Sequence, residues 1–454
     1  MTPPAAQDSA LALPKPGLRH EDEDRSVDRT RVHQARLGKR RWLLLWLLIG
    51  PGILAMLGEN DGPSMISYTT TGATYGLGAF LPFTLLTFAM AIVCQEMCMR
   101  IGAVTHRGYG QLVLERFGRM WGWFNAGDLI LTNLVTLVAE FVSIRIGLAY
   151  FHLSAGVAAA LGIALVLFTI SGGRYWRWER IVLGMAVFNG LFLVAAIMSH
   201  PNWGKVGHAF ATASPFPGGS LNTLLLLVAS TVGATVTPWM IFFQQSASAD
   251  KGMTPDDLSH GRYDTWAGAV MAAMFGCGAL IAGAALFGHG GAGVEGLSGA
   301  GFPAALGHTS GGAVGTIFAL GLIEAGAVAI LTISASTGYA VGECIGAPHS
   351  FNRTVRRSAF WVANVGAAVV AGAIILVPGV PLLSIALNAN VLATVLLPVA
   401  LVFLILLASD REIMGRWANS RLNSLVAVMI VGFVSLCGAT YAVYAFLHTA
   451  HVIG

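Results

Sequence analysis

The sequence predicts an all-α integral membrane protein, on the evidence of its composition, its long apolar runs and the placement of its basic residues. Of its 454 residues, 55% are hydrophobic, only 11% are charged, and 56 residues are glycine. Soluble domains carry about 25% charged residues, so this composition is typical of proteins that cross the bilayer several times. The net charge of +4 does not indicate nucleic-acid binding, because the basic residues gather at the predicted membrane edges.

Eleven apolar runs are long enough to cross a bilayer core of about 30 Å, which takes roughly 20 helical residues. We expect transmembrane helices near 42–75, 79–101, 123–150, 155–171, 181–199, 221–249, 266–288, 313–343, 358–377, 382–408 and 422–447. Polar residues and helix breakers interrupt the first and the sixth of these runs.

The basic residues predict the orientation of the chain. If the N-terminus is cytoplasmic, 24 of the 26 Lys and Arg residues fall in inside segments. The exceptions are Lys205, in an outside loop, and Arg145, within a span. Since cytoplasmic loops are enriched in Lys and Arg, we expect a multi-pass protein of the cytoplasmic membrane, surrounded by lipid, with its N-terminus inside and its C-terminus outside.

The two interruptions occupy equivalent places in two halves of five spans each. GENDGP breaks the first span at residues 58–63, and GATVTPW breaks the sixth at residues 233–239. Because five is an odd number, the two halves must have opposite topology. A broken first helix in each half of an inverted repeat is typical of a secondary transporter whose substrate binds near the middle of the membrane. A single break could be a harmless kink, but two matched breaks, one with carboxylates, favour function.

The predicted domains follow from the same pattern. Residues 1–41 are rich in Pro and in mixed charges, which predicts a disordered cytoplasmic tail and no cleaved signal peptide. Residues 42–454 are expected to form the transmembrane transport domain. Its inverted repeats would cover about 42–200 and 221–408, with an extra helix at 422–447.

Five motifs carry a family resemblance: GPGILAMLGENDGPS in the first span, RIGAVTHRG after the second, VAEF in the third, GATVTPWMIFFQQSASADKG in the sixth and STGYAVGE in the eighth. Through them residues 42–447 resemble the Nramp family of divalent metal transporters. The resemblance implies a LeuT-like fold of eleven helices, a 5+5 inverted repeat with broken helices 1 and 6. It also implies alternating access with the divalent cation as substrate, no cofactor and no enzymatic activity.

The resemblance places the metal ligands at the two breaks. The family's Asp-Pro-Gly-Asn motif corresponds here to Asp61, Gly62, Pro63 and Ser64, and its Met-Pro-His motif corresponds to Thr237, Pro238 and Trp239. The implied ligands are the Asp61 carboxylate, the Ser64 hydroxyl, the backbone carbonyls of Gly58 and Ala234, Thr237 in place of the Met, and Asn390 in the tenth span. Asn388 and Asn390 diverge on a helix, so only one of them can face the site.

The ligand types favour Mg²⁺ and Mn²⁺ over Fe²⁺ or Cd²⁺. Oxygen ligands suit hard cations, whereas the thioether that is missing here suits softer metals. The chain therefore resembles the branch of the family that lacks the Met and includes magnesium transporters. Glu59 is expected either to supply negative charge around a hydrated ion or to cap the half-helix.

Further polar residues are expected around the site or along the permeation path: Glu59, Asn60, Trp239, Gln244, Glu140, Asp128 and Glu324. Trp239 replaces a His and Leu137 replaces an acid that carry protons in the family, which favours uncoupled, potential-driven entry over proton symport. Glu140 either titrates or is a structural acid that hydrogen-bonds within the bundle. Glu96 is expected to pair with Arg100 one helical turn away.

Two other classes of function are less consistent with the sequence. A membrane enzyme with a carboxylate–metal site would need several His or acidic residues at ligand spacing, and the loops have only isolated His residues. A transporter of an organic solute such as an amino acid could share the fold, but Asp61 and Glu59 would repel the carboxylate of the solute. Charge therefore favours a cation.

Overall fold

The computed structural model of the chain describes residues 34–449, apart from 36, 39, 172–174, 213–219, 288–300 and 346–358. Over these ranges the protein consists of helices and connections, and none of the described residues forms a strand. The tail predicted to be disordered, residues 1–41, falls mostly outside the described residues.

The elements of the first half of the chain are α2 (Arg41–Leu48), α3 (Pro51–Gly58), α4 (Gly62–Tyr75), α5 (Phe80–Thr105), α6 (Tyr109–Phe117), α7 (Arg119–Tyr150), α8 (Ala155–Ser171), α9 (Tyr175–Ala186), the 3₁₀ helix η1 (Val187–Gly190), α10 (Leu191–Met198) and α11 (Trp203–Thr212). Those of the second half are α12 (Leu221–Gly233), α13 (Pro238–Asp250), η2 (Pro255–Asp257), α14 (Leu258–Ala284), α15 (Gly301–Ser310), α16 (Gly312–Ile345), α17 (Ala359–Leu376), α18 (Leu382–Ser409), α19 (Arg411–Met414), η4 (Gly415–Trp417) and α20 (Arg421–Thr449).

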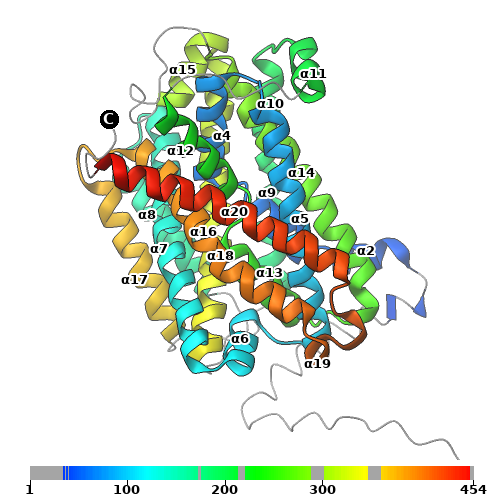
Figure 1. Cartoon of the computed structure of the whole chain (residues 1–454). Helices are drawn as coiled ribbons and strands as arrows, with labels where there is room; N and C mark the ends of the chain where they lie inside the picture. Colours follow the sequence, from blue (N-terminus) through cyan, green and yellow to red (C-terminus); the bar gives the residue numbers. More distant parts are fainter. Residues whose placement is uncertain are drawn as a thin grey trace, which may run out of the picture.

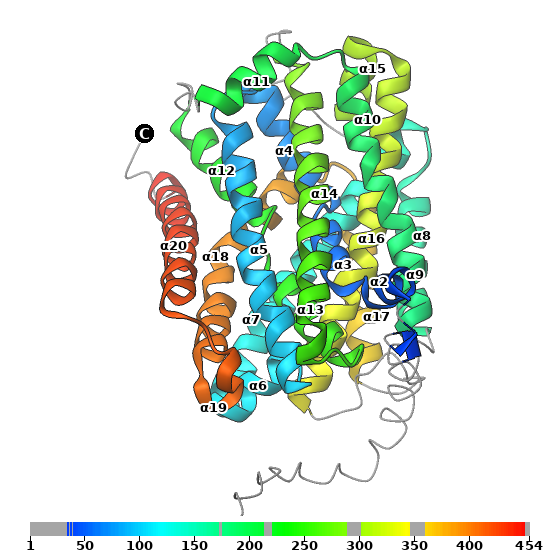
Figure 2. The same cartoon turned by 90° about the vertical axis from the view of Figure 1, so that its right-hand side faces the viewer.

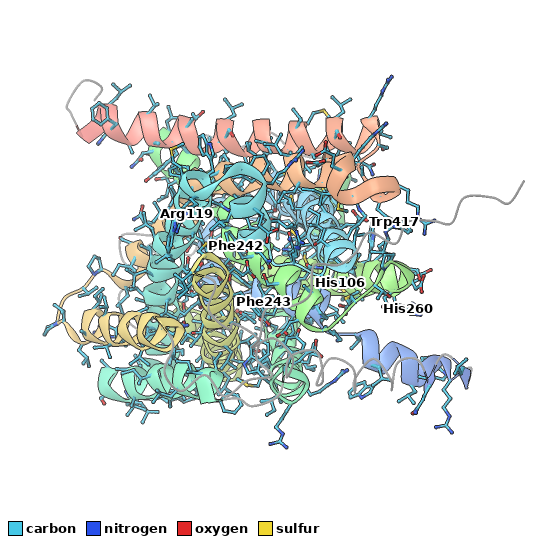
Figure 3. All side chains as sticks on the ribbon, turned by 90° about the horizontal axis from the view of Figure 1, so that it is seen from below. His106, Arg119, Phe242, Phe243, His260 and Trp417 are labelled. Atoms are coloured by element: carbon cyan, nitrogen blue, oxygen red, sulfur yellow. The ribbon has the colours of Figure 1, made fainter. Side chains whose placement is uncertain are left out.

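The long helices form one elongated bundle, with short helices at its two ends (Figures 1 and 2). The helices α6 and α19 lie at one end, and α11 and α15 lie at the other. Figure 3 looks onto the first of these ends, where His106, Arg119, His260 and Trp417 lie. The connections that the basic residues assign to one side of the membrane therefore meet at one end of the bundle.

Ion pairs join these connections. Arg100 pairs with Glu96 at 3.1 Å, which confirms the expected pair one turn apart, and Arg262 of α14 reaches the same carboxylate at 3.0 Å. Arg116 of α6 pairs with Asp410, just before α19, at 2.7 Å. These pairs hold α5 to α14, and α6 to the segment that follows α18, at this end of the bundle.

Within the described residues, eight helices are long and apolar enough to cross a membrane, counting the broken α12–α13 as one. The other three predicted spans coincide with the broken pair α3–α4 and with the shorter helices α8 and α17. Eleven crossings therefore stays a prediction, while the positions of the helices agree with the predicted runs.

The start of the first span differs from the prediction. The sequence predicts one interrupted run from residue 42, but the chain forms a separate helix α2 and then turns at Gly50, whose φ is +156°. The helix that leads to the first break begins at Pro51, the first residue of α3. Gly50 interrupts the helix within the apolar run, because glycine readily adopts this conformation, and apolar periodicity does not reveal such a turn.

The two breaks divide their spans as predicted. Three residues separate α3 from α4, and four residues separate α12 from α13. A Pro stands at the first or second position of both α4 and α13, where its missing N–H costs nothing. Each break therefore presents the carbonyl end of one half-helix and the amide end of the next within the bundle.

Close helix contact around the second break depends on Gly233, the last residue of α12. A Cβ atom there would lie 1.8 Å from the backbone carbonyl oxygen of Asn390 on α18. The half-helix α12 can therefore pack against α18 only if residue 233 has no side chain, and this contact fixes the height of the second break.

We predict that Gly233→Ala lowers the free energy of unfolding by about 1–3 kcal/mol, because the backbone of α12 must move away from α18. The matched control is Gly184→Ala in α9, where no atom lies within 4 Å of the added Cβ and alanine is the better helix former. Thermal unfolding of both purified variants in detergent is the measurement. If the two variants melt together, the contact does not constrain the fold.

Candidate functional site

The two breaks face each other in the interior, joined by one side-chain hydrogen bond. Thr237 Oγ1, in the second break, donates to Glu59 Oε2, in the first, at 2.8 Å. Both residues are buried, with exposed fractions of 1% and 0%. Residues 178 positions apart in the chain thus form one polar centre between four half-helix ends.

Asp61 caps the second half of the first span. Its Oδ1 accepts a hydrogen bond from the backbone N–H of Ser64 at 2.8 Å, so the carboxylate sits at the positive end of α4. Asp61 thus caps the start of α4, whereas Glu59 is the C-terminal cap residue of α3, and its role in supplying negative charge stays a prediction. Asp61 Oδ2 and Ser64 Oγ receive no hydrogen bond from the described residues.

Glu140 of α7 adds a third carboxylate to this centre. Its Oε2 accepts the N–H of Gly62 at 3.1 Å, directly after Asp61 in the chain. A Cβ on Gly62 would lie 2.2 Å from Cβ of Ser143, so only glycine allows the amide end of α4 to come this close to α7. The structure therefore brings Glu140 to the first break.

The charge of this centre is not neutralised by a basic side chain. Glu59, Asp61 and Glu140 all have exposed fractions of 0%. The ion pairs recorded among the described residues involve none of the three. One oxygen of each carboxylate also lacks a hydrogen bond within the described part of the chain. Buried carboxylates are costly unless a cation or a proton compensates them, so the centre has the electrostatics of a cation site.

The second break supplies a hydroxyl and backbone carbonyls. The carbonyl of Ala234 accepts a hydrogen bond from Tyr68 Oη at 2.9 Å, and the same hydroxyl lies 2.8 Å from Thr235 Oγ1. A carbonyl oxygen has two lone pairs, so this bond leaves Ala234 one further acceptor position. Met240 brings a thioether close, but its Sδ accepts the N–H of Thr237 at 3.4 Å and so caps α13.

Gly58, whose carbonyl is a predicted ligand, ends α3 against two other helices. A Cβ at residue 58 would lie 3.0 Å from both the indole of Trp239 and Thr332 Oγ1 of α16. The indole therefore occupies the space beside the first break, and its Nε1 has no hydrogen-bond partner among the described residues.

Of the two Asn residues in the tenth predicted span, Asn390 lies inside the bundle and Asn388 lies at its surface. Asn390 has an exposed fraction of 1% and packs against Gly233, whereas Asn388 is exposed and bonds to Ser384 of its own helix. The Nδ2 of Asn390 has no hydrogen-bond partner within the described ranges. Only Asn390 of the two is therefore buried, and its role as a ligand stays a prediction.

The sequence also predicts four further residues around the site or along the permeation path. Asn60 Nδ2 donates to the carbonyl of Ala272, and Gln244 Nε2 donates to Thr265 Oγ1, so both side chains tie the broken helices to α14. Asp128 and Glu324 lie on α7 and α16 as partly exposed residues, and Asp128 Oδ2 and both Glu324 carboxylate oxygens have no hydrogen-bond partner among the described residues.

No three His, Cys, Asp or Glu side chains converge to hold an ion anywhere in the described ranges. An ion at the breaks would therefore have to combine carboxylates with backbone carbonyls, hydroxyls and its own water, as suits a transported ion that must also leave.

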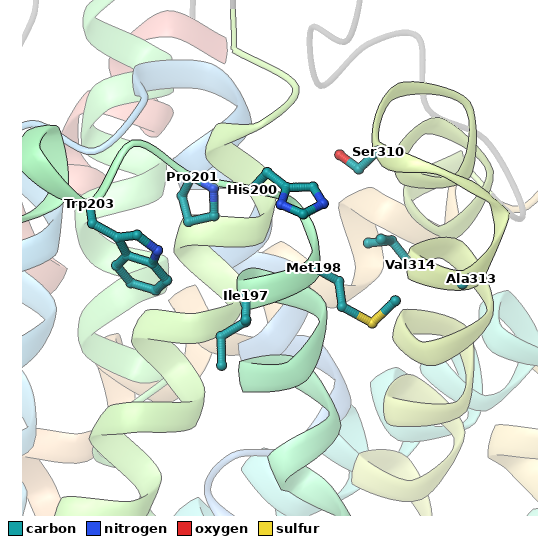
Figure 4. A pocket seen from close by; sticks show the side chains of 8 residues that line it. All are labelled: Ile197, Met198, His200, Pro201, Trp203, Ser310, Ala313 and Val314. Carbon is teal, nitrogen blue, oxygen red and sulfur yellow. The ribbon is translucent and has the colours of Figure 1, made fainter.

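Two open cavities lie elsewhere, at the end of the bundle that carries α11 and α15. One cavity, of about 610 Å³, lies between the end of α10 and the start of α16, with Met198, His200 and Val314 in its wall (Figure 4). A neighbouring cavity of about 900 Å³ also has His200 in its wall. Neither lining includes an acidic residue, so the candidate cation site is the closed centre between the breaks.

Sequence reasoning missed the hydroxyl residues that organise the second break. Tyr68 lies seven residues after Asp61, two turns along α4, and this spacing could have assigned it to the same helix face. Thr235 lies between the two ends of α12 and α13 and contacts Thr87 of α5 at 2.9 Å. That contact has no sequence signal, because it depends on how α5 packs.

Comparison with known proteins agrees with this geometry. A sequence model for the family described as natural resistance-associated macrophage protein-like (Nramp) matches residues 52–444. A divalent metal cation transporter, MntH 1, of Pseudomonas aeruginosa is 26% identical over 88% of this chain and 92% of its own length. The MntH of Burkholderia ambifaria is 25% identical over 94% of this chain and 97% of its own length.

Solved structures share the fold. A manganese transporter from Eremococcus coleocola superposes with a TM-score of 0.73 at 19% identity, covering 87% of this chain and 86% of that protein. MhsT, solved in complex with L-phenylalanine, superposes with a TM-score of 0.58 at 15% identity, covering 87% of this chain and 97% of its own. Both likenesses are evidence for the LeuT-like architecture with two broken helices.

We expect Thr237→Val to lower the free energy of unfolding by about 1–3 kcal/mol, because Glu59 Oε2 loses its donor while remaining buried. Thr237→Ser keeps the hydroxyl and is the matched control, for which only a small change is expected. Thermal unfolding in metal-free detergent buffer compares the two variants. If Thr237→Val and Thr237→Ser unfold at the same temperature, the hydrogen bond between the breaks does not contribute to the free energy of unfolding.

Proposed function

This chain belongs to the Nramp family, and we propose that it carries the hard divalent cations Mg²⁺ and Mn²⁺ inward across the cytoplasmic membrane by alternating access. Divalent metal transport is the activity that family membership supports. The metal is the substrate and not a cofactor, and the protein is a transporter and not an enzyme.

The observation that carries this proposal is the set of three buried carboxylates at the first break. Glu59, Asp61 and Glu140 lie between half-helix ends, with the positive end of α4 beside only Asp61 and Glu140. A divalent cation balances most of this charge, and it can share the carboxylates with backbone carbonyls. The ligands proposed for it are Asp61, Ser64, Thr237, Asn390 and the carbonyls of Gly58 and Ala234.

Oxygen chemistry supports Mg²⁺ and Mn²⁺ over softer ions. Every proposed ligand atom at the two breaks is an oxygen, and the thioether of Met240 is engaged by the backbone of its own helix. Glu59 and Glu140 supply negative charge around an ion that retains some of its water, which Mg²⁺ gives up reluctantly. Thr237, which bonds to Glu59, connects this charge to the second break.

The membrane potential supplies the driving force in this proposal. Two positive charges that cross an inside-negative membrane gain about 4.6 kcal/mol per 100 mV. Trp239 cannot carry a proton in place of a His, and Glu140 accepts a hydrogen bond from Gly62. We therefore propose uncoupled entry, with the basic end of the bundle in the cytoplasm and the C-terminus outside.

An organic solute is the second candidate, because MhsT shares the fold. The charge of the centre is the argument against it. An amino acid would bring its own carboxylate to three buried carboxylates, two of which already occupy the amide end of α4 that would bind it.

We predict that Asp61→Ala lowers the rate of saturable Mg²⁺ and Mn²⁺ uptake into proteoliposomes at least tenfold, because a charged ligand is lost. Uptake by the parent is expected to proceed without acidification of the lumen, as read by an internal pH-sensitive dye. Glu412→Ala, which removes an exposed carboxylate of α19, is the control with the same change in charge.

Loss of Mg²⁺ and Mn²⁺ flux in Asp61→Ala but not in Glu412→Ala supports the proposed site. Absence of flux for either metal in the parent, under an imposed inside-negative potential, contradicts metal transport and favours the organic solute. Luminal acidification that accompanies metal uptake contradicts the uncoupled mechanism alone.

A separate prediction concerns selectivity between metal ions. Thr237→Met places a thioether at the second break, and we expect uptake of Cd²⁺ relative to Mg²⁺ to rise by about tenfold, because sulfur ligands favour softer cations. Thr237→Leu has similar size without the sulfur and loses the same hydroxyl, so it isolates the ligand effect. If Thr237→Met and Thr237→Leu show a similar ratio of Cd²⁺ uptake to Mg²⁺ uptake, residue 237 does not contact the ion.

A further inference from the structure

The amino end of α3, the inner half of the first span, is held by a buried carboxylate. Asp264 of α14 accepts the N–H of Gly50 on Oδ1 at 3.0 Å and the N–H of Gly52 on Oδ2 at 2.7 Å. Asp264 is 4% exposed. One side chain thus satisfies two amides of the first helical turn, where the helix dipole is positive.

A buried ion pair holds the residue that precedes this turn. Lys251, at the end of α13, donates to the carbonyl of Ile49 at 2.8 Å and to Glu179 of α9 at 2.9 Å. The side chains of Lys251 and Glu179 are 1% and 0% exposed. A Cβ on Gly50 would lie 2.0 Å from Glu179 Oε1, so the chain passes over this pair only because residue 50 is glycine.

These contacts lie between the ion site and the basic end of the bundle. The eight residues of α3 span about 12 Å, which separates them from the first break. The rings of Trp239, Phe243 and Trp178 form a row in the same region, with centroids 6.2 and 6.1 Å apart. Figure 3 shows Phe243 near the middle of the bundle when it is viewed from that end.

The outer halves of the two broken spans are joined by weaker bonds. Ser67 of α4 lies 2.8 Å from Ser230 of α12, hydroxyl to hydroxyl, and Tyr68 donates to the carbonyl of Ala234. All four groups are neutral. Because hydrogen bonds to charged groups are roughly twice as strong as neutral ones, the bonds that hold the amino end of α3 to α14 are stronger than those that join α4 to α12.

We propose that Asp264, Lys251 and Glu179 form an ionic latch that closes the cytoplasmic exit by holding the amino end of α3. Release of the ion to the cytoplasm requires α3 to leave α14 and α13, and the latch sets the free energy of that step. Its members are positioning residues, since none of them contacts the breaks. The inference rests on the proposed transport function but not on the identity of the ion.

The test reads the position of α3 directly. Ala55 is fully buried and lies one turn before Gly58, so a cysteine there is inaccessible while the latch is closed. In full-length protein whose five native cysteines are replaced, Ala55→Cys is labelled with a membrane-permeant maleimide in inside-out vesicles. We expect Asp264→Asn, which retains the size of the side chain, to raise the labelling rate at least tenfold.

Glu343→Gln is the matched control. Glu343 is also a buried carboxylate near the basic end, but it accepts from Ser246 of α13 at 2.6 Å and from Gly110 of α6 at 2.8 Å, and not from α3. We expect its labelling rate to remain within about twofold of the parent rate. Equal labelling of Asp264→Asn and the parent, or an equal rise in Glu343→Gln, would overturn the latch.

A second variant, and a labelling readout that does not depend on ion flux, allow the latch to be tested separately from transport. If Asp264→Asn does not yield monodisperse protein, Lys251→Gln removes the bond to Ile49 and is expected to raise labelling in the same way. Labelling reports exposure of α3 and not ion flux, so a parent that moved no metal would refute the proposed function while the latch could still be confirmed or refuted.

Discussion

The structure depends on burying unwound backbone, together with charged side chains, in the middle of a helical bundle. In the bilayer core every backbone polar group needs a partner inside the protein, and a broken helix survives only where its free ends are satisfied. Here the amide end of α4 is satisfied by the carboxylates of Asp61 and Glu140, and the two breaks are joined by Thr237 and Glu59. The same groups that allow the chain to unwind also create the negative charge that attracts a cation, so folding and ion binding use one set of atoms.

This double use explains why close helix packing matters beyond stability. Gly62 and Gly233 remove the side chains that would separate the half-helices from α7 and α18. Since the carbonyl and amide ends lie at fixed heights only while these contacts hold, packing sets the geometry of the ion site. The charges then act in a region from which water is largely excluded, where electrostatic interactions are much stronger than at a surface.

The ends of the broken helices differ in how they are held. Neutral hydroxyl groups join the outer halves, whereas Asp264, Lys251 and Glu179 hold the inner half α3 through charge. In the proposed orientation, release toward the cytoplasm would break the charged hydrogen bonds at the amino end of α3, whereas the bonds between α4 and α12 are neutral.

The sequence by itself determined the helices, the two breaks, the halves they divide and the gathering of basic residues at one end, because apolar run length and helix breakers act locally. Helical periodicity also predicted that only one of Asn388 and Asn390 can face the site, and the family resemblance pointed to Asn390. Only the tertiary structure decided that α2 is a separate helix, that Asp61 and not Glu59 caps α4, and that Tyr68 and Asp264 matter. Those roles depend on which residues meet across the bundle from distant parts of the chain, and no local pattern specifies such contacts.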